Sequence, residues 1–259
     1  MSEKQSIIEK TFFRIMYVKV RRRAKRIYDK LTEPKVVKIS IYISLLSFFP
    51  GLIIGLAIAI NYGPIGYSLW YNYISDLGSK VYTPTPFILD LTVIITSIFI
   101  VPLILNMSRL YSSEMSDNID NSKKIHYINI FRRIFGYSGI VSLIFGVLGM
   151  FNVGIFSLDR SPLNIHYFFA ALTFGGFAFG SFFTGLAIVM KKKIFPRIIG
   201  YFMVFGPPAA SILYIINPQP LTREFLEWVM TFMALIWYYP LVFITLQKLN
   251  TLLFFKSGY

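Results

Sequence analysis

Six long apolar segments alternate with polar connections along this chain. They cover residues 39–60, 87–107, 134–156, 165–190, 198–216 and 225–246. Each contains about 20 residues, and an α-helix of that length crosses a hydrocarbon core of about 30 Å. A chain inside lipid must satisfy its backbone hydrogen bonds internally, so these segments predict helices. The pattern therefore predicts an all-α, polytopic six-helix bundle that occupies residues 39–247.

The basic residues indicate which end of the bundle faces the cytoplasm. Of the 26 Lys and Arg residues, all but Lys80, Arg160 and Arg223 flank the predicted helices on one side. Cytoplasmic connections of membrane proteins carry such an excess of positive charge. We therefore predict a multi-pass protein of the cell membrane with both termini in the cytoplasm and residues 248–259 as a short cytoplasmic tail.

The N-terminal segment 1–38 is strongly cationic and has a helical apolar period. Apolar side chains recur every three or four residues at Phe12, Met16, Val20, Ala24, Ile27 and Leu31. This spacing predicts an amphipathic helix on the inner leaflet, where each Lys or Arg gains about 1 kcal/mol from anionic lipid. The alternative is a topology signal followed by a loose tail. Such a segment is also suited to binding another subunit of a membrane complex.

The connection between the first two predicted spans is longer and richer in turn residues than the others. It contains the turn Ser75-Asp76-Leu77-Gly78, two prolines before the second span, and Asp90 at a depth where lipid should begin. Asp side chains cap backbone N–H groups in turns, and Gly permits positive φ. We therefore predict a structured outer loop, with Asp76 as a cap and Gly78 at a positive φ.

Composition excludes several classes of function. The chain is 55% hydrophobic, its mean hydropathy is +0.60, and its net charge is +14. The positive charges flank membrane spans, which argues against nucleic acid as the partner. Cysteine is absent, so thiolate metal sites and thiol nucleophiles are excluded. Of the two histidines, His126 lies on the cytoplasmic side, which leaves too few ligands for a catalytic zinc site, and we expect no metal or cofactor.

Small residues predict close helix packing in the fourth span. Gly176 and Gly180 are four residues apart, and Ala171 and Gly175 form an adjacent pair. This spacing lets two helix backbones approach closely. The Gly176/Gly180 face is therefore expected to meet another helix, either within the bundle or from another membrane-protein subunit.

Polar residues gather at the outer ends of the second, fourth and sixth spans. A head-group site there would use helix N-termini and cations to bind a lipid phosphate. Its candidate residues are Ser75, Asp76, Lys80, Asp90, Asp159, Arg160, His166 and Arg223. As an alternative, Asp76, Asp90 and His166 would form a general acid/base group. In a purely structural role, Asp90 would pair with Arg160 or His166 to fasten the outer loop.

One family has the same order of features. The outer loop ends in Ile74-Ser75-Asp76-Leu77-Gly78, a proline-led second span follows, and an Asp159 to Pro162 turn precedes His166. This order resembles the six-span proteins of domain-of-unknown-function family 998 and, more distantly, the FRAG/DRAM/Sfk group of eukaryotic membrane proteins. The likeness covers residues 39–246. It implies a six-helix bundle with both termini inside, and it brings no catalytic residues; the eukaryotic relatives are linked to lipid handling and membrane trafficking.

The predicted interior is nearly uncharged, which disfavours pumps and ion-coupled carriers. We therefore expect a non-enzymatic bundle that binds membrane lipids or serves as an accessory subunit of a membrane complex. A membrane-embedded enzyme acting on lipid head groups or acyl chains at the outer leaflet is the first alternative. A small-solute transporter is the second, although only Asn106, Asn152 and scattered Ser and Thr residues would provide its polar path.

Overall fold

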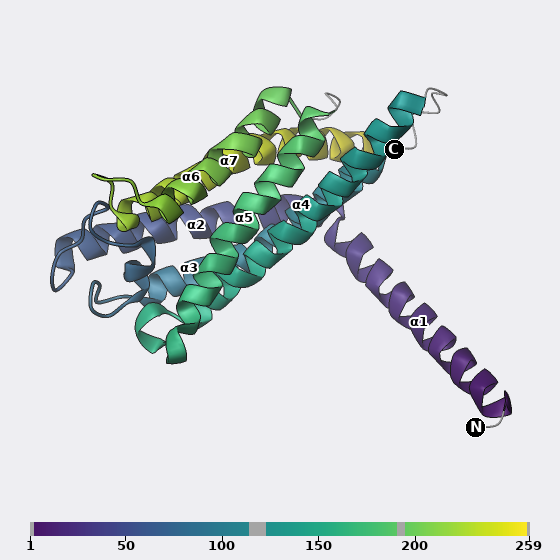
Figure 1. Ribbon diagram of the computed structural model, residues 1–259, viewed down its shortest axis with the longest axis horizontal. Coiled ribbons are helices and arrows are strands. Elements are labelled where there is room, and N and C mark those ends of the chain that lie inside the picture. Colours follow the sequence, from purple (N-terminus) through teal and green to yellow (C-terminus); the bar gives the residue numbers. More distant parts are fainter. Residues whose placement is uncertain (1–2, 114–122, 191–194, 258–259) are drawn as a thin grey trace.

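The computed structural model describes residues 3–113, 123–190 and 195–257 (Figure 1). Within these ranges the chain forms helices and turns and no strand. The long helices are α1 (Glu3–Leu31), α2 (Pro34–Tyr62), α3 (Phe87–Ser113), α4 (Lys123–Ile155), α5 (Ile165–Val189), α6 (Arg197–Ile216) and α7 (Arg223–Ser257). Three short 3₁₀ helices are η1 (Ile74–Gly78), η2 (Leu158–Arg160) and η3 (Pro162–Asn164).

The predicted six-helix membrane bundle is confirmed. Six helices in the described ranges, α2 to α7, are long and apolar enough to cross a membrane. Several extend beyond the predicted apolar segments, because a helix can continue into the polar region outside the hydrocarbon. α7 is the clearest case: it continues through the segment that we assigned to a cytoplasmic tail and ends at Ser257.

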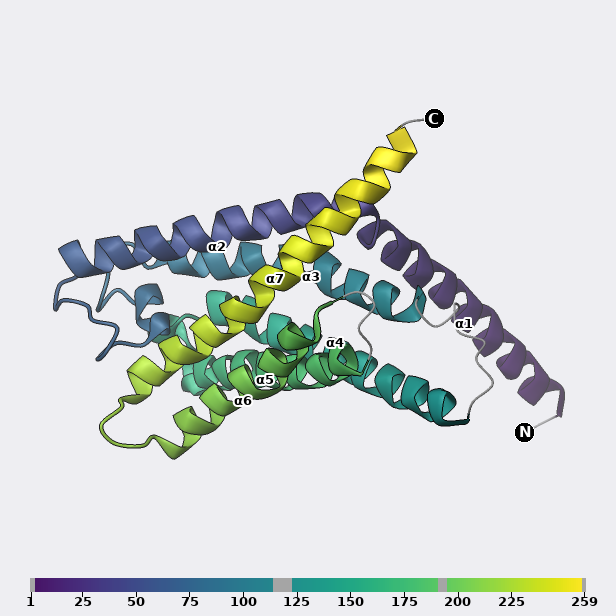
Figure 2. The same ribbon diagram turned by 90° about the horizontal axis from the view of Figure 1, so that it is seen from above.

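The connections between helices define two ends of the bundle. Residues 63–86, 157–164 and 217–222 lie together at one end, which we call the loop end (Figures 1 and 2). The start of α1 and the end of α7 lie at the opposite end, which we call the basic end. Because the number of spans is even, the first span begins and the last span ends at the same end of the bundle.

α1 projects away from the bundle at the basic end (Figures 1 and 2). Its last turn is held to α3, since the Tyr28 hydroxyl lies 2.8 Å from the Ser108 hydroxyl oxygen and Arg109 Nη1 donates to the Thr32 carbonyl at 3.2 Å. Glu33 is extended because it precedes Pro34, and this separates α1 from α2. The binding of segment 1–38 to an anionic leaflet or another subunit stays a prediction.

From α2 to α7, helices that follow each other in sequence pack side by side, and the closest pair is α4 with α5. A Cβ atom added to Gly176 would lie 2.3 Å from the Gly146 backbone nitrogen, so the two backbones are in contact. A Cβ atom added to Gly180 would lie 2.6 Å from the Leu143 side chain. The Gly176/Gly180 face is thus occupied by α4 of the same chain.

α7 is packed differently from the other spans. It lies mainly against α6 and makes fewer contacts with α2 and α5. It crosses the bundle obliquely and separates from α2 toward the loop end (Figure 2). There, η1 contacts α2, α3 and α7. The outer loop therefore occupies the wedge that the inclined helix leaves open.

We expect Gly176→Ala to destabilise the bundle, because its new methyl group would force α4 and α5 apart. Overpacking of this kind costs about 1–3 kcal/mol. Gly175→Ala is the matched control, since no atom lies within 4 Å of its added Cβ and alanine favours the helix. Thermal unfolding in detergent should show a lower midpoint for Gly176→Ala alone. Equal midpoints would contradict the backbone contact.

Candidate functional site

The predicted structured loop is confirmed, and it is anchored on α7. The indole Nε1 of the buried Trp228 donates to the Asn72 carbonyl at 3.0 Å, and the Trp70 ring packs on Phe225 with centroids 4.5 Å apart. The Thr222 hydroxyl donates to the Trp70 carbonyl. Loop residues and the first turns of α7 thus form one packed unit at the loop end.

Asp76 lies inside this unit and is only 3% exposed. Its Oδ2 accepts hydrogen bonds from the Tyr73 N–H at 3.0 Å and from Asn72 Nδ2 at 3.3 Å. The predicted capping role is therefore confirmed. Burial raises the pKa of the Asp76 carboxyl, and the two hydrogen bonds offset only part of that effect.

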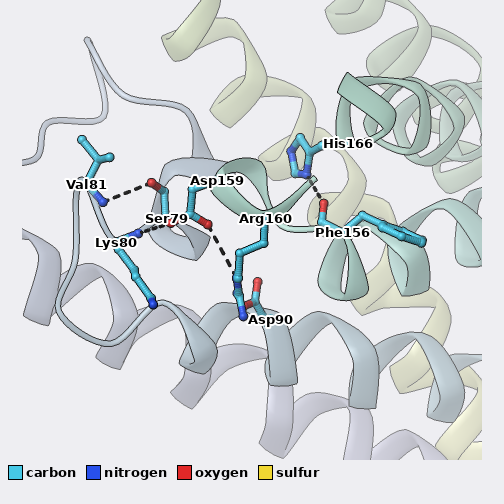
Figure 3. A network of polar contacts seen from close by, with 8 residues as sticks. All are labelled: Ser79, Lys80, Val81, Asp90, Phe156, Asp159, Arg160 and His166. Atoms are coloured by element: carbon cyan, nitrogen blue, oxygen red, sulfur yellow. Dashed lines mark hydrogen bonds and ion pairs between the residues drawn. The ribbon is translucent and has the colours of Figure 1, made fainter. Parts of the chain in front are cut away.

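A second polar group fastens the loop to α3 and to the connection between α4 and α5 (Figure 3). Asp90, in the first turn of α3, forms an ion pair with Arg160. The Arg160 Nε atom lies 3.6 Å from Asp159 Oδ1, and Asp159 Oδ2 accepts the backbone N–H of Lys80 at 2.8 Å. Arg160 thus holds two carboxylates, and Lys80 contributes its backbone rather than its ammonium group.

Gly78 lies against this group, but for a different reason from the one predicted. Its φ is not positive, so the predicted conformation is wrong. A Cβ atom at this position would lie 2.9 Å from Asp90 Oδ1 and 3.7 Å from the Ser157 Cβ. Glycine is needed because the end of η1 passes directly over the Asp90 carboxylate. A side chain there would push the loop away from the ion pair.

His166, in the first turn of α5, belongs to neither group. Its backbone N–H donates to the Ser161 hydroxyl at 2.8 Å, as expected for a serine that caps a helix. Its ring Nδ1 lies 2.7 Å from the Phe156 carbonyl oxygen (Figure 3). Nε2 has no partner within the described structure, although the residue is only 2% exposed. The ring is therefore held by the backbone on one side and open on the other.

His166 also lines a cavity of about 160 Å³. Side chains of α2, α3, α4, α5 and α7 form its wall, together with Ile74 and Ser75 of η1. Most of the lining is aliphatic or aromatic. At the loop end it is polar, with Ser75, His166 and Glu227. The Thr96 hydroxyl and the Trp237 indole nitrogen also border the cavity without a partner in the described structure.

Glu227 is a candidate that sequence reasoning missed. It is 6% exposed, lies next to the Ser75 backbone, and is close enough to Asp76 for the two carboxylates to repel each other. The expectation of a nearly uncharged interior is wrong at this position. Its sequence neighbours could have identified it. Glu224 is an ordinary acidic residue at a helix start, whereas Glu227 lies between the buried Leu226 and Trp228.

The predicted site residues therefore separate instead of converging at one point. Lys80, Asp90, Asp159 and Arg160 fasten the loop, Asp76 caps it, and Ser75 and His166 face the cavity. Arg223 is exposed at the start of α7. Among the described hydrogen bonds, none joins His166 to Asp76 or Asp90. Within the described ranges, no three His, Asp or Glu side chains lie close enough together to hold a metal ion.

We expect Arg160→Ala to loosen the loop, because it leaves Asp90 with a buried, unpaired carboxylate. The Arg160 side chain is 47% exposed, so solvent screens the pair and the loss should be about 1–2 kcal/mol rather than that of a fully buried pair. Lys80→Ala is the control, since its N–H remains. In limited proteolysis and thermal unfolding, Arg160→Ala should be cleaved faster and unfold at a lower temperature than Lys80→Ala. A double variant that also carries Asp90→Asn should recover part of the loss.

The raised pKa of Asp76 predicts a pH-dependent stability. A folded state that favours the protonated carboxyl binds more protons than the unfolded state, so the contribution is fully present below about pH 4 and is lost as pH rises toward the folded pKa. Asp76→Asn keeps an oxygen acceptor and removes the charge. The unfolding midpoint of Asp76→Asn should therefore rise relative to that of the wild type as the pH increases from 4 to 8. A constant difference across this range would contradict the burial effect.

Comparison of the chain with protein-family models, with curated proteins and with solved structures finds no match. The resemblance to domain-of-unknown-function family 998 therefore stays a prediction. The functional argument rests on the geometry of the loop end and of the cavity beneath it.

Proposed function

We propose that this chain is a non-enzymatic, lipid-binding membrane bundle that holds an apolar chain in the cavity between α2, α3, α4, α5 and α7. The observation that carries the proposal is a mainly apolar cavity inside a membrane bundle, with the imidazole of His166 and the carboxyl of Glu227 at its loop end. Concave apolar sites with a few convergent polar groups are typical of ligand pockets. An amphiphile matches that division between apolar body and polar end.

The size of the cavity supports an occupied state. Unfilled space costs about 24 cal/mol per Å³, so 160 Å³ would cost about 4 kcal/mol. A lipid chain that enters from the bilayer gains little hydrophobic energy, because lipid tails are already apolar. It does restore the dispersion contacts that the wall lacks. Filling the void is thus the main source of affinity.

The seam between α2 and α7 is the route that we propose for entry. The two helices meet through the Ser44 and Tyr238 hydroxyls at 3.1 Å and through the Phe49 and Tyr239 rings at 5.2 Å. Otherwise they make few contacts, and the lining residues Leu45 and Phe48 are partly exposed at the bundle surface. Side-chain motion along this seam would connect the cavity with the lipid.

We expect Ala170→Phe to abolish lipid retention, because the new ring would project into the cavity that Ala170 lines. Ala171→Phe is the matched control: it adds the same ring one residue along α5, at an exposed position outside the cavity. Lipid extraction and mass spectrometry of the purified proteins should find a bound lipid with the wild type and Ala171→Phe only. Equal lipid content in all three proteins would refute the cavity as the binding site.

A further inference from the structure

We propose that the cavity selects a single-chain lipid whose head group is uncharged and donates a hydrogen bond, of the long-chain alcohol class, with its hydroxyl on His166 Nε2. This inference rests on the proposed lipid-binding function and deepens it. Three independent features of the cavity carry it: its shape, the acceptor that His166 presents, and the charge of its wall.

The shape of the cavity favours one unbranched chain. Its wall on α3 extends from Leu89 to Met107, eighteen residues that rise about 27 Å along a helix. A volume of about 160 Å³ is close to that of an engineered cavity that holds one benzene ring, so it takes only part of a long chain. It excludes a fused ring system or two acyl chains side by side, and the rest of a long chain must leave through the seam between α2 and α7. Diacyl phospholipids and sterols are therefore poor occupants.

The tautomer of His166 defines which head group fits. A carbonyl oxygen can only accept a hydrogen bond, so the Nδ1 atom 2.7 Å from the Phe156 oxygen carries the proton. In the neutral ring, Nε2 then presents a lone pair. This atom is buried and has no partner in the described structure, and its residue lines the cavity. A head group that donates a hydrogen satisfies it, and one that only accepts leaves it unpaired.

The charge of the wall excludes anionic head groups. None of the described residues lining the cavity is Lys or Arg, whereas Glu227 is an acid. Arg160, the nearest candidate for a phosphate, is already paired with Asp90 and Asp159 outside the cavity. A phosphate or carboxylate head would therefore be buried without a compensating cation. A hydroxyl group carries no such penalty.

The position of the polar groups fixes the orientation of the ligand. Ser75, His166 and Glu227 all lie at the loop end, in η1 or in the first turns of α5 and α7. Thr96 lies nine residues into α3 and Trp237 fourteen residues into α7, about 14 Å and 21 Å deeper along their helices. The other polar residues of the wall already have hydrogen-bond partners within the chain; they are Ser44, Thr173, Thr231 and Tyr238. The head group therefore lies at the loop end and the chain extends toward the basic end.

The test compares three probes that share one chain: hexadecane, 1-hexadecanol and hexadecyl phosphate. Each is titrated against the delipidated full-length protein in detergent, and affinity is measured by competition with a fluorescent fatty-chain probe. We expect hexadecanol to bind about five- to tenfold more tightly than hexadecane, the value of one buried hydrogen bond, and hexadecyl phosphate to bind most weakly. Equal affinities of the alcohol and the alkane would overturn the inference, as would tightest binding of the phosphate.

Two variants test which residues of the cavity distinguish between the head groups. His166→Phe keeps a ring and removes the acceptor, so the preference for hexadecanol over hexadecane should disappear while the affinity for hexadecane stays. Glu227→Gln adds no cation to the wall, so hexadecyl phosphate should remain the weakest of the three probes on this variant. Should His166→Phe fail to fold, the comparison of the three probes on the wild type still decides the question. If no probe binds at all, the proposed lipid-binding function itself fails; if all three bind equally, only the head-group inference does.

Discussion

The hydrocarbon around a membrane bundle offers no hydrogen-bonding partner, so each polar group near it must find one within the chain. This constraint explains the construction of the loop end. Asp90 would be costly at the start of α3, and Arg160 neutralises it from the connection between α4 and α5. Trp228 would carry an orphan N–H inside α7, and the Asn72 carbonyl accepts it from the outer loop. The polar cap is held in place because the helices beneath it need partners.

Glycine contacts and the inclination of α7 together produce the cavity. Gly146 and Gly176 allow α4 and α5 to touch, which draws these two helices into a tight pair. α7 has no comparable contact with α2 or α5 and leans on α6 instead. Space therefore remains between α7 and the rest of the bundle. η1 closes it at the loop end, where Ser75 and Glu227 meet.

The sequence was sufficient to predict whatever depends on composition and period. Apolar segments of spanning length predicted the six helices, and turn residues predicted a structured loop in which Asp76 caps a backbone N–H. It was not sufficient where the outcome depends on which helix faces meet. Gly78 is required by the proximity of Asp90, a contact between segments that no local pattern encodes. Glu227 follows an ordinary acidic helix start, and only the packing of η1 on α7 shows that its carboxyl is buried.

The same constraint separates structural from binding roles among residues that looked equivalent in the sequence. Asp90, Asp159 and Arg160 are ionisable groups at the membrane surface, but they satisfy one another and have little left to offer a ligand. His166 is less conspicuous as a charge, yet it is the residue whose second ring nitrogen is unpartnered in the described structure and borders an apolar space. A buried acceptor that the chain leaves unpaired is stabilised by an occupant that donates a hydrogen bond to it. The chemistry of the occupant therefore follows from the bond that the protein leaves unmade.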